Sequence, residues 1–401
     1  MAAAGTHRIR IGLLGLGTVG QAVARTVSRT AGDGLDVTVG CALVRDITRA
    51  RRVPPGLRLT TNPEAFLRGR YDVVIDALAG REPAATLVAR VLGRGVPVVS
   101  ANKSMLATDA PRLRRIAARA GTVLRVEAAA IAGVPFIGTL ERRPLAARAD
   151  RFTGVLNGTS NYVLTRMAAG VTLDGAVSEA QSRGYAEPDP HADLSGADAR
   201  DKVAVLTPVL LGAALSPGAI DTSGITGLTP ADLDAASRLG GAIRPIGHAA
   251  KSAHGIAAFA APCWLPASHP LATLHGIDNG IAIEGRYVPR VWFAGPGAGA
   301  TITAATLLDD ALEAVSGGSM PLWGEATESA APQAPAATGW FIRLPATREA
   351  SRLEALIATS VSIDDTRWAL VPASSAPALL NEVSALRDAG VQVPHWRALD
   401  V

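Results

Sequence analysis

The sequence predicts an α/β protein with an N-terminal dinucleotide-binding domain, a second domain of α+β type and a small C-terminal module. Three observations support this division. A strand-like run leads into a glycine motif at residues 15–20, and a helical pattern follows. Carboxylates and a lysine are concentrated between residues 187 and 202, directly before an apolar run. A stretch rich in Pro, Ala, Gly and Ser precedes a last group of short strand and helix patterns.

The glycine motif predicts a dinucleotide site. Ile9–Leu14 reads as a strand, and the helical pattern Gln21–Arg29 follows the motif. In such a motif the first glycine makes a tight turn, the second admits a pyrophosphate and the third allows close helix–strand packing. The helix N-terminus then supplies the anion site. The predicted cofactor ligands here are Gly15, Gly17, Thr18, Val19 and Gly20.

The end of the next strand, Asp36–Val44, bears on the choice of cofactor. An acidic residue there would hold the ribose 2′-hydroxyl of NAD, whereas guanidinium groups suit the 2′-phosphate of NADP. Arg45 comes first, then Asp46, and further arginines follow at 49, 51 and 52. We expect NADP to be preferred and NAD to be accepted as well. The alternative is a solvated basic turn.

Two further strands, Asp72–Leu78 and Gly95–Ser100, extend the parallel sheet, and the helix Pro83–Gly93 connects them. The carboxyl ends of such strands face the ligand crevice. Ser100 and Lys103 are therefore expected beside the cofactor, with Lys103 able to reach a substrate. The alternative for Lys103 is an ordinary surface lysine.

The segment 154–202 predicts three helices around an acidic loop. The first is expected to begin at a cap, Thr159 or Ser160, and to end at Gly170. The second is expected at Leu173–Arg183, with Thr172 as its cap and Gly184 after its end. The third is expected to start at Asp193 or Ser195. Pro188 and Pro190 should keep Tyr185–His191 out of any helix.

On the third helix Asp198 and Lys202 stand at i and i+4 and share one face. Glu187 lies in the preceding loop and can bend over that face. Such groups beside the apolar run Val203–Leu206 indicate a pocket with tuned acid–base side chains. The alternative is a surface ion pair worth about 0.3–0.5 kcal/mol.

These segments together resemble the homoserine dehydrogenase family. The motifs that carry the resemblance, in the family's order, are IGLLGLGTVG, VVSANK, EAAAIAGVPFI, GVLNGTSNY, GYAEPDPHADLSGADARDK and GPGAGATITA. They extend over roughly Ile9 to Val315, and the GTSNY-to-GADARDK block is the most specific of them. The resemblance implies hydride transfer between NAD(P) and the pair L-homoserine and L-aspartate-4-semialdehyde.

The resemblance also implies residue roles. Lys202 matches the family's acid/base lysine, which needs a pKa below the usual value of about 10.4, and desolvation in a closed cleft can lower it. Lys103 matches a lysine near cofactor and substrate. The residues that match the substrate-binding set are Glu187 and Asp198, which would hold the substrate ammonium, with Asp193, Gly184 and Tyr185.

Two further segments match the family. Residues 127–134 resemble its sodium loop, with Glu127 and the backbone carbonyls of Ala130, Ala132 and Val134 as ligands; from the residues alone this is a Gly/Ala turn. Gly297 resembles a segment that returns to the cofactor before the helix Thr303–Val315.

The chain departs from the family at two places. Asp76-Ala-Leu-Ala-Gly80 stands where the family more often has Glu and Ile-Gly-Gly, and His191 replaces a small polar residue. Two alternatives therefore stay open: a related Rossmann reductase of a homoserine-like amino alcohol or aldehyde in specialised metabolism, and a non-catalytic cofactor-binding sensor.

The expected domains are a Rossmann domain at 1–145 with a return at 291–318, a substrate-binding and dimerisation domain at 146–290, a linker at 319–338, and a module at 339–401. The module resembles an ACT domain in its βαββαβ order. Its expected strands and helices are Trp340–Pro345, Ser351–Thr359, Ser362–Trp368, Ala369–Val371, Pro377–Ala389 and Val391–Trp396. The ACT ligand loop is missing, since Pro345-Ala-Thr-Arg stands there, so we expect a structural or dimer-forming role.

Composition agrees with a folded enzyme. Apolar residues make up 48% of 401 residues and charged residues 18%, which argues against disorder. The net charge of +4 is spread too thinly to predict a nucleic-acid partner, and no apolar run is long enough to predict a membrane span. Two cysteines give no disulfide framework. We expect a cytoplasmic homodimer or homotetramer that acts on a small amino acid.

Overall fold

The computed structural model describes residues 8–30, 36–143, 145, 147–317, 328–333, 338–344 and 348–400. The chain forms two compact units. The first comprises Met1–Arg148, Ala204–Pro217 and Ala298–Ser329; the second comprises Ala149–Val203, Gly218–Gly297 and Ala330–Val401. In the described ranges, no helix has the length and apolar character needed to cross a bilayer.

The first unit contains a parallel sheet of six strands in the order β3-β2-β1-β4-β5-β6. The strands are β1 Ile9–Leu14, β2 Val37–Leu43, β3 Leu59–Thr60, β4 Val73–Asp76, β5 Val98–Ser100 and β6 Leu124–Arg125. This is the order of a doubly wound dinucleotide-binding fold, so the predicted α/β class is confirmed.

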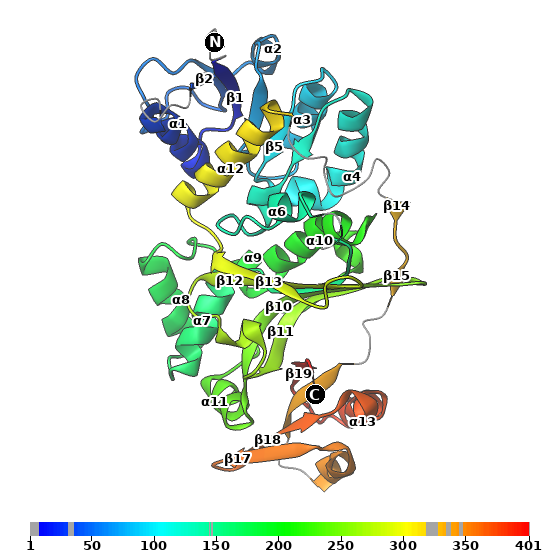
Figure 1. The fold of residues 1–401 in the computed structure, drawn as a ribbon. Coiled ribbons are helices and arrows are strands. Elements are labelled where there is room, and N and C mark those ends of the chain that lie inside the picture. Colours follow the sequence, from blue (N-terminus) through cyan, green and yellow to red (C-terminus); the bar gives the residue numbers. More distant parts are fainter. Residues whose placement is uncertain are drawn as a thin grey trace. The chain divides into compact units, whose positions relative to one another are not determined.

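Helices cover this sheet. In Figure 1, α1 (Thr18–Thr30) and α12 (Ala300–Val315) lie side by side, and both contribute side chains to the core cluster that includes Ile11 and Leu13 of β1. α3 (Ala84–Leu92) contacts α4 (Lys103–Arg119). The α12 helix starts three residues before the expected Thr303, directly after Gly299, whose φ is +126°. The smaller elements are α2 Pro63–Leu67, α5 Glu127–Ala130, α6 Ile137–Glu141, β8 Ala213–Ala214 and β14 Glu328–Ser329.

The second unit is built on a mixed sheet in the order β13-β12-β7-β10-β11-β19-β16-β18-β17, with β9 and β15 also paired to β11. Its first part comprises β7 Ala149–Val155, β9 Asp221–Thr222, β10 Gly241–Ser252, β11 Gly255–Pro266, β12 Asp278–Gly285, β13 Val291–Pro296 and β15 Pro332–Gln333. The helices here are α7 Gly158–Ala168, α8 Leu173–Ser182, α9 His191–Leu194, α10 Ala197–Leu211 and α11 Pro230–Arg238, with 3₁₀ turns at Pro217–Ala219 and Pro270–Thr273. The unit boundary falls inside α10, after Val203.

Three helix starts in this unit differ from the prediction. One is that of α10, which begins at Ala197 and not at Asp193 or Ser195. The cap of α7 is Asn157, whose side chain accepts from the Ser160 N–H at 2.7 Å, so Thr159 and Ser160 were the wrong residues. His191 begins α9 although it was expected outside any helix, because a proline is tolerated at a helix start and Pro190 serves as the cap position. The prediction for α8 is confirmed: Thr172 caps it, and Gly184 follows with a φ of +72°.

The C-terminal segment follows the predicted order of strands and helices except that a 3₁₀ stretch replaces the expected helix Ser351–Thr359, and the likeness to an ACT domain is not confirmed. It comprises β16 Gly339–Leu344, a 3₁₀ stretch Arg348–Leu356, β17 Thr359–Ile363, β18 Thr366–Val371, a 3₁₀ turn Ala373–Ser375, α13 Ala376–Asp388 and β19 His395–Ala398. The strand expected at Ser362–Trp368 was wrong, because the chain turns at Asp364, where φ is +52°. Strand β19 pairs with β11, so this segment extends the sheet of the second unit. Most of the expected linker and Pro345-Ala-Thr lie outside the described residues.

Candidate active site

The three motif glycines have different surroundings. Gly15 has a φ of +90°, and a Cβ there would lie 2.8 Å from the Ala77 carbonyl oxygen. A Cβ on Gly20 would lie 2.3 Å from the carbonyl oxygen of Gly15. A Cβ on Gly17 would meet no heavy atom of the described residues within 4 Å apart from its chain neighbours, and Gly17 and Thr18 are exposed. The turn, the tight packing and the open approach for a pyrophosphate therefore fall on the three glycines that the motif assigns to them.

The cofactor-selecting turn after β2 presents arginine outward. Arg45 is exposed. The Asp46 carboxylate accepts from the Thr48 N–H at 2.8 Å and from its hydroxyl at 2.7 Å. Because the aspartate closes its own turn, exposed Arg45 is a candidate ligand for a cofactor phosphate.

A buried hydrogen-bond chain ties together the carboxyl ends of β4 and β5. Asp76 is fully buried and accepts from the Ser100 hydroxyl at 2.8 Å and from the Leu78 N–H at 3.1 Å. The Ser100 hydroxyl in turn accepts from the Asn102 N–H. Asn102 caps α4 and donates to the Gly80 carbonyl at 2.7 Å. Lys103 follows as the first residue of α4, so this chain of contacts sets its backbone.

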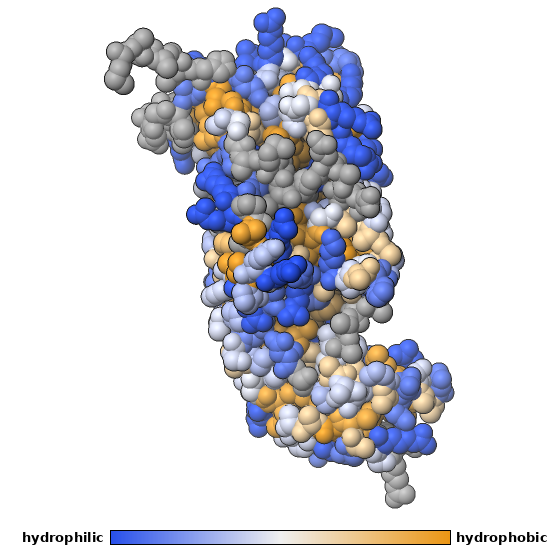
Figure 2. Space-filling model, turned by 45° about the vertical axis from the view of Figure 1, so that its right-hand side comes forward, coloured by the Kyte–Doolittle hydropathy of each residue, from blue (hydrophilic) through white to orange (hydrophobic). Residues whose placement is uncertain are grey.

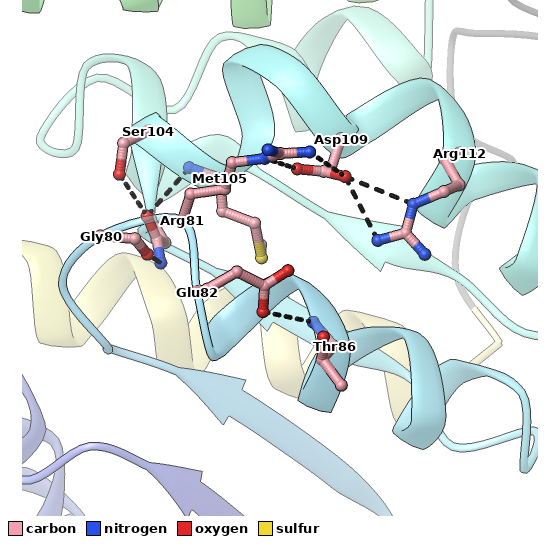
Figure 3. Close-up of polar contacts among 9 residues, drawn as sticks. Gly80, Arg81, Glu82, Thr86, Ser104, Met105, Asp109 and Arg112 are labelled. Carbon is pink, nitrogen blue, oxygen red and sulfur yellow. Dashed lines mark hydrogen bonds and ion pairs between the residues drawn. The ribbon is translucent and has the colours of Figure 1, made fainter.

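Ion pairs also connect the loop after β4 to α4. Figure 3 shows Arg81 and Arg112 turned toward Asp109, with ion-pair distances of 2.6 Å and 3.2 Å. Asp109 is buried, whereas both arginines are largely exposed. This ion-pair cluster holds residues 80–82 against the helix that begins with Lys103.

Replacing Asp76 with asparagine is expected to change how stability depends on pH. Burial raises the pKa of Asp76 from 3.8 to about 6. An acid whose pKa is raised in the folded state favours folding at pH values below its pKa in the unfolded chain. This contribution to stability is lost as the pH rises through about 4 to 6. At about 1.4 kcal/mol per pKa unit the loss is on the order of 3 kcal/mol.

Asparagine does not ionise, so the variant should gain stability relative to the parent protein by that amount between pH 4 and pH 7. Urea unfolding of both proteins across this range measures the difference. Parallel curves would contradict the assignment of a raised pKa to Asp76.

In the second unit, Asp198 and Lys202 form a buried pair on α10. Lys202 Nζ lies 3.1 Å from Asp198 Oδ2, and the two side chains are only 7% and 10% exposed. Lys202 also donates to the carbonyl of Leu156 at the end of β7. The surface-pair alternative is therefore wrong, because both side chains of a surface ion pair would be exposed to solvent.

Asn157 joins the acidic residues of this cluster. Its Nδ2 donates to Asp193 Oδ1 at 2.7 Å and to Asp198 Oδ2 at 2.8 Å, while its Oδ1 caps α7. The hydroxyl of Ser160 donates to the Asp193 carbonyl oxygen at 2.8 Å. Asn157 was not among the site residues predicted from the sequence. Its place before a helix was the signal for a cap, but nothing in the sequence indicated its bridge between two aspartates.

The other predicted substrate residues lie on the loop between α8 and α9. Glu187 has an exposed side chain, and its backbone carbonyl accepts from Gln181. The carbonyl of Tyr185 accepts from the Thr159 hydroxyl at 2.7 Å, and its ring packs edge-on against Tyr162. Asp193, Asp198 and Lys202 are therefore brought together, and Glu187 stays on the exposed loop beside Gly184 and Tyr185.

The predicted cation loop is buried, and its carboxylate and one of its carbonyls accept hydrogen bonds. The Glu127 carboxylate accepts from the N–H groups of Phe136, Ile137 and Gly138, and burial raises its pKa to about 7. The carbonyl of Ala132 accepts from the Thr306 hydroxyl. In the part of the chain that the structure describes, no cluster of three His, Cys, Asp or Glu side chains could hold a metal. Ala130 and Val134, also buried, would contribute backbone oxygens.

Comparisons with known proteins place the chain in a family. A family model described as "Homoserine dehydrogenase, NAD binding domain" matches residues 15–127, and one described as "Homoserine dehydrogenase" matches residues 135–312. The homoserine dehydrogenase of Synechocystis sp. is 33% identical over 318 residues, which cover 77% of this chain and 73% of that protein. The chain belongs to the homoserine dehydrogenase family.

Other homoserine dehydrogenases agree. That of Lactococcus lactis is 33% identical over 77% of this chain and 74% of its own length. A crystal structure of a homoserine dehydrogenase from Thiobacillus denitrificans covers 98% of both chains at 27% identity with a TM-score of 0.87. The chain is thus an NAD(P)-dependent oxidoreductase of the homoserine dehydrogenase type, acting on a CH–OH group, and neither alternative from the sequence is favoured.

Proposed function

We propose that this chain interconverts L-homoserine and L-aspartate-4-semialdehyde, with Lys202 as the acid–base group. The observation that carries this proposal is the buried Lys202–Asp198 pair bridged to Asp193 by Asn157. The ammonium of Lys202 lies beside carboxylates, in a unit separate from the glycine motif. It supplies the proton that reduction of an aldehyde requires.

The cofactor, when bound at the glycine motif, supplies or accepts the hydride. Lys202 gives a proton to the aldehyde oxygen in one direction and removes it from the alcohol in the other. Asp198 and Glu187 hold the substrate ammonium, and Asn157 orients Asp198 through its hydrogen bond. The chain from Asp76 to Asn102 fixes the backbone of Lys103. In this proposal Lys103 acts beside cofactor and substrate.

The test is NADPH oxidation with two aldehydes. L-Aspartate-4-semialdehyde should be reduced with saturation kinetics. Succinate semialdehyde, which lacks only the ammonium, should be reduced with a kcat/KM at least about tenfold lower, because the carboxylates then hold nothing. Equal kcat/KM values for both aldehydes would contradict recognition of the ammonium.

A second proposal concerns the cofactor: NADPH is preferred over NADH through Arg45. Replacing Arg45 with alanine should raise the KM for NADPH about tenfold, because a charge-assisted contact to the 2′-phosphate is lost. The KM for NADH should stay within threefold. Arg29→Ala, an exposed arginine at the far end of α1, is the control. A rise of the same size for both cofactors would contradict the assignment.

We also propose a sodium ion at Glu127, Ala130, Ala132 and Val134. The four residues are buried, and a carboxylate with backbone carbonyls is the kind of ligand set that a hard cation prefers. The ion would brace this loop against α12 rather than take part in the reaction. Broadening of the sodium-23 resonance on titration with protein measures binding directly.

A homodimer or homotetramer is our proposal for the assembly. Strand β13 forms an edge of the larger sheet and carries Trp292, which is 48% exposed. Figure 2 shows hydrophobic residues at the surface among hydrophilic ones on the face it draws. Multi-angle light scattering gives the mass. A cytoplasmic location stays a prediction.

A further inference from the structure

Asn279 carries a buried amide without partners. It is the second residue of β12 and lies opposite Gly295 of β13. The side chain is 1% exposed, and neither Nδ2 nor Oδ1 has a hydrogen-bond partner in the described part of the chain. Buried polar atoms are nearly always paired in folded proteins, so an amide kept in this state needs a reason.

The amide lies between two glycines from distant parts of the sequence. A Cβ on Gly297 would lie 2.0 Å from Asn279 Oδ1, and a Cβ on Gly158 would lie 3.1 Å from the same atom. Neither glycine has a left-handed φ, so neither is required by its backbone conformation. At position 297 the closeness of Asn279 is what excludes a side chain.

The position of the amide is fixed by other contacts. Asn161 of α7 donates to the carbonyls of Gly276 and Asp278, both at 3.1 Å, and so binds the turn before β12 to α7. Gly158 adjoins Asn157, which bridges Asp193 and Asp198. Asn279 therefore lies beside both the first turn of α7, which follows the bridging residue Asn157, and the segment 295–297.

We propose that Asn279 is a positioning residue that joins segment 295–297 to the first turn of α7, and that its amide gains its hydrogen bonds from that segment when ligands bind. A side chain needed for packing alone would be leucine, which has the same shape and no polar atoms to leave unpaired. The inference rests on the proposed function, since it assumes that cofactor and amino acid bind to this chain.

The experiment compares Asn279→Leu with the parent protein in two measurements. The thermal unfolding midpoint without ligand should be unchanged or higher, because unpaired polar atoms are removed. The value of kcat/KM for L-aspartate-4-semialdehyde should fall at least about tenfold, and the rise in midpoint on adding NADP⁺ with L-homoserine should shrink by at least half.

Two results would overturn the proposal. A lower midpoint with kcat/KM within threefold would mean that the amide binds a structural water in the free protein. An unchanged or higher midpoint with unchanged kinetics would mean that it has no role. If the leucine variant does not fold, Asn279→Ala should show the same tenfold loss of kcat/KM. Kinetics of the alanine variant equal to those of the parent protein would contradict the proposal. Absence of turnover by the parent protein would instead contradict the proposed function. The shift of the unfolding midpoint on adding NADP⁺ would still test the role of Asn279.

Discussion

Replacing Lys202 with methionine should lower kcat for L-aspartate-4-semialdehyde by at least about a hundredfold. Proton transfer by a positioned side chain contributes roughly 10²–10⁴ to a rate, and methionine keeps the length and apolar stem of lysine without its proton. Lys202 is buried and contacts Asp198 and the Leu156 carbonyl. In the methionine variant no solvated group therefore takes over its proton transfer. Stopped-flow and steady-state NADPH oxidation measure the loss.

The dissociation constant for NADPH should change by less than threefold in this variant, because the glycine motif belongs to the other unit. Lys251→Met, at an exposed lysine of β10, is the matched control and should keep parent activity. A Lys202 variant that retains more than a tenth of the parent kcat would remove lysine as the acid–base group.

The second large effect is expected at Asp198. In Asp198→Asn the buried ammonium of Lys202 loses its carboxylate, and a broken buried pair costs about 3–5 kcal/mol of stability. The kcat/KM for L-aspartate-4-semialdehyde should fall about a hundredfold, since a desolvated charge contact is worth about 2–5 kcal/mol in binding. Urea unfolding and steady-state kinetics measure the two effects.

The two aldehydes separate binding from stability. If Asp198 holds the ammonium, the loss should be several times larger for L-aspartate-4-semialdehyde than for succinate semialdehyde. Asp201→Asn is the control, since Asp201 pairs with its neighbour Arg200 on the same helix. Identical losses for both aldehydes would limit Asp198 to a structural role.

The sequence predicted those features of the site that depend on local geometry. The glycine motif determines a turn over six residues, and i, i+4 spacing places Asp198 and Lys202 on one helical face. The bridge from Asn157 to two aspartates was missed because it depends on how α7 packs beside α9 and α10. No periodicity records such a contact.

The C-terminal segment illustrates the same limit. Asp364-Asp365 was an available turn signal, yet the alternating residues around it read as one continuous strand, and the hairpin was misplaced. The pairing of β19 with β11 joins residues more than a hundred positions apart, which strand propensity does not register. The unpaired amide of Asn279 likewise arises from tertiary packing.

The most direct measurement is a crystal structure of the protein with NADP⁺ and L-homoserine. It should place Lys202 Nζ within hydrogen-bond reach of the substrate hydroxyl, about 2.6–3.2 Å, with the carbon that bears that hydroxyl facing the nicotinamide ring. A Lys202 side chain directed into solvent in every subunit, with substrate bound elsewhere, would contradict the account.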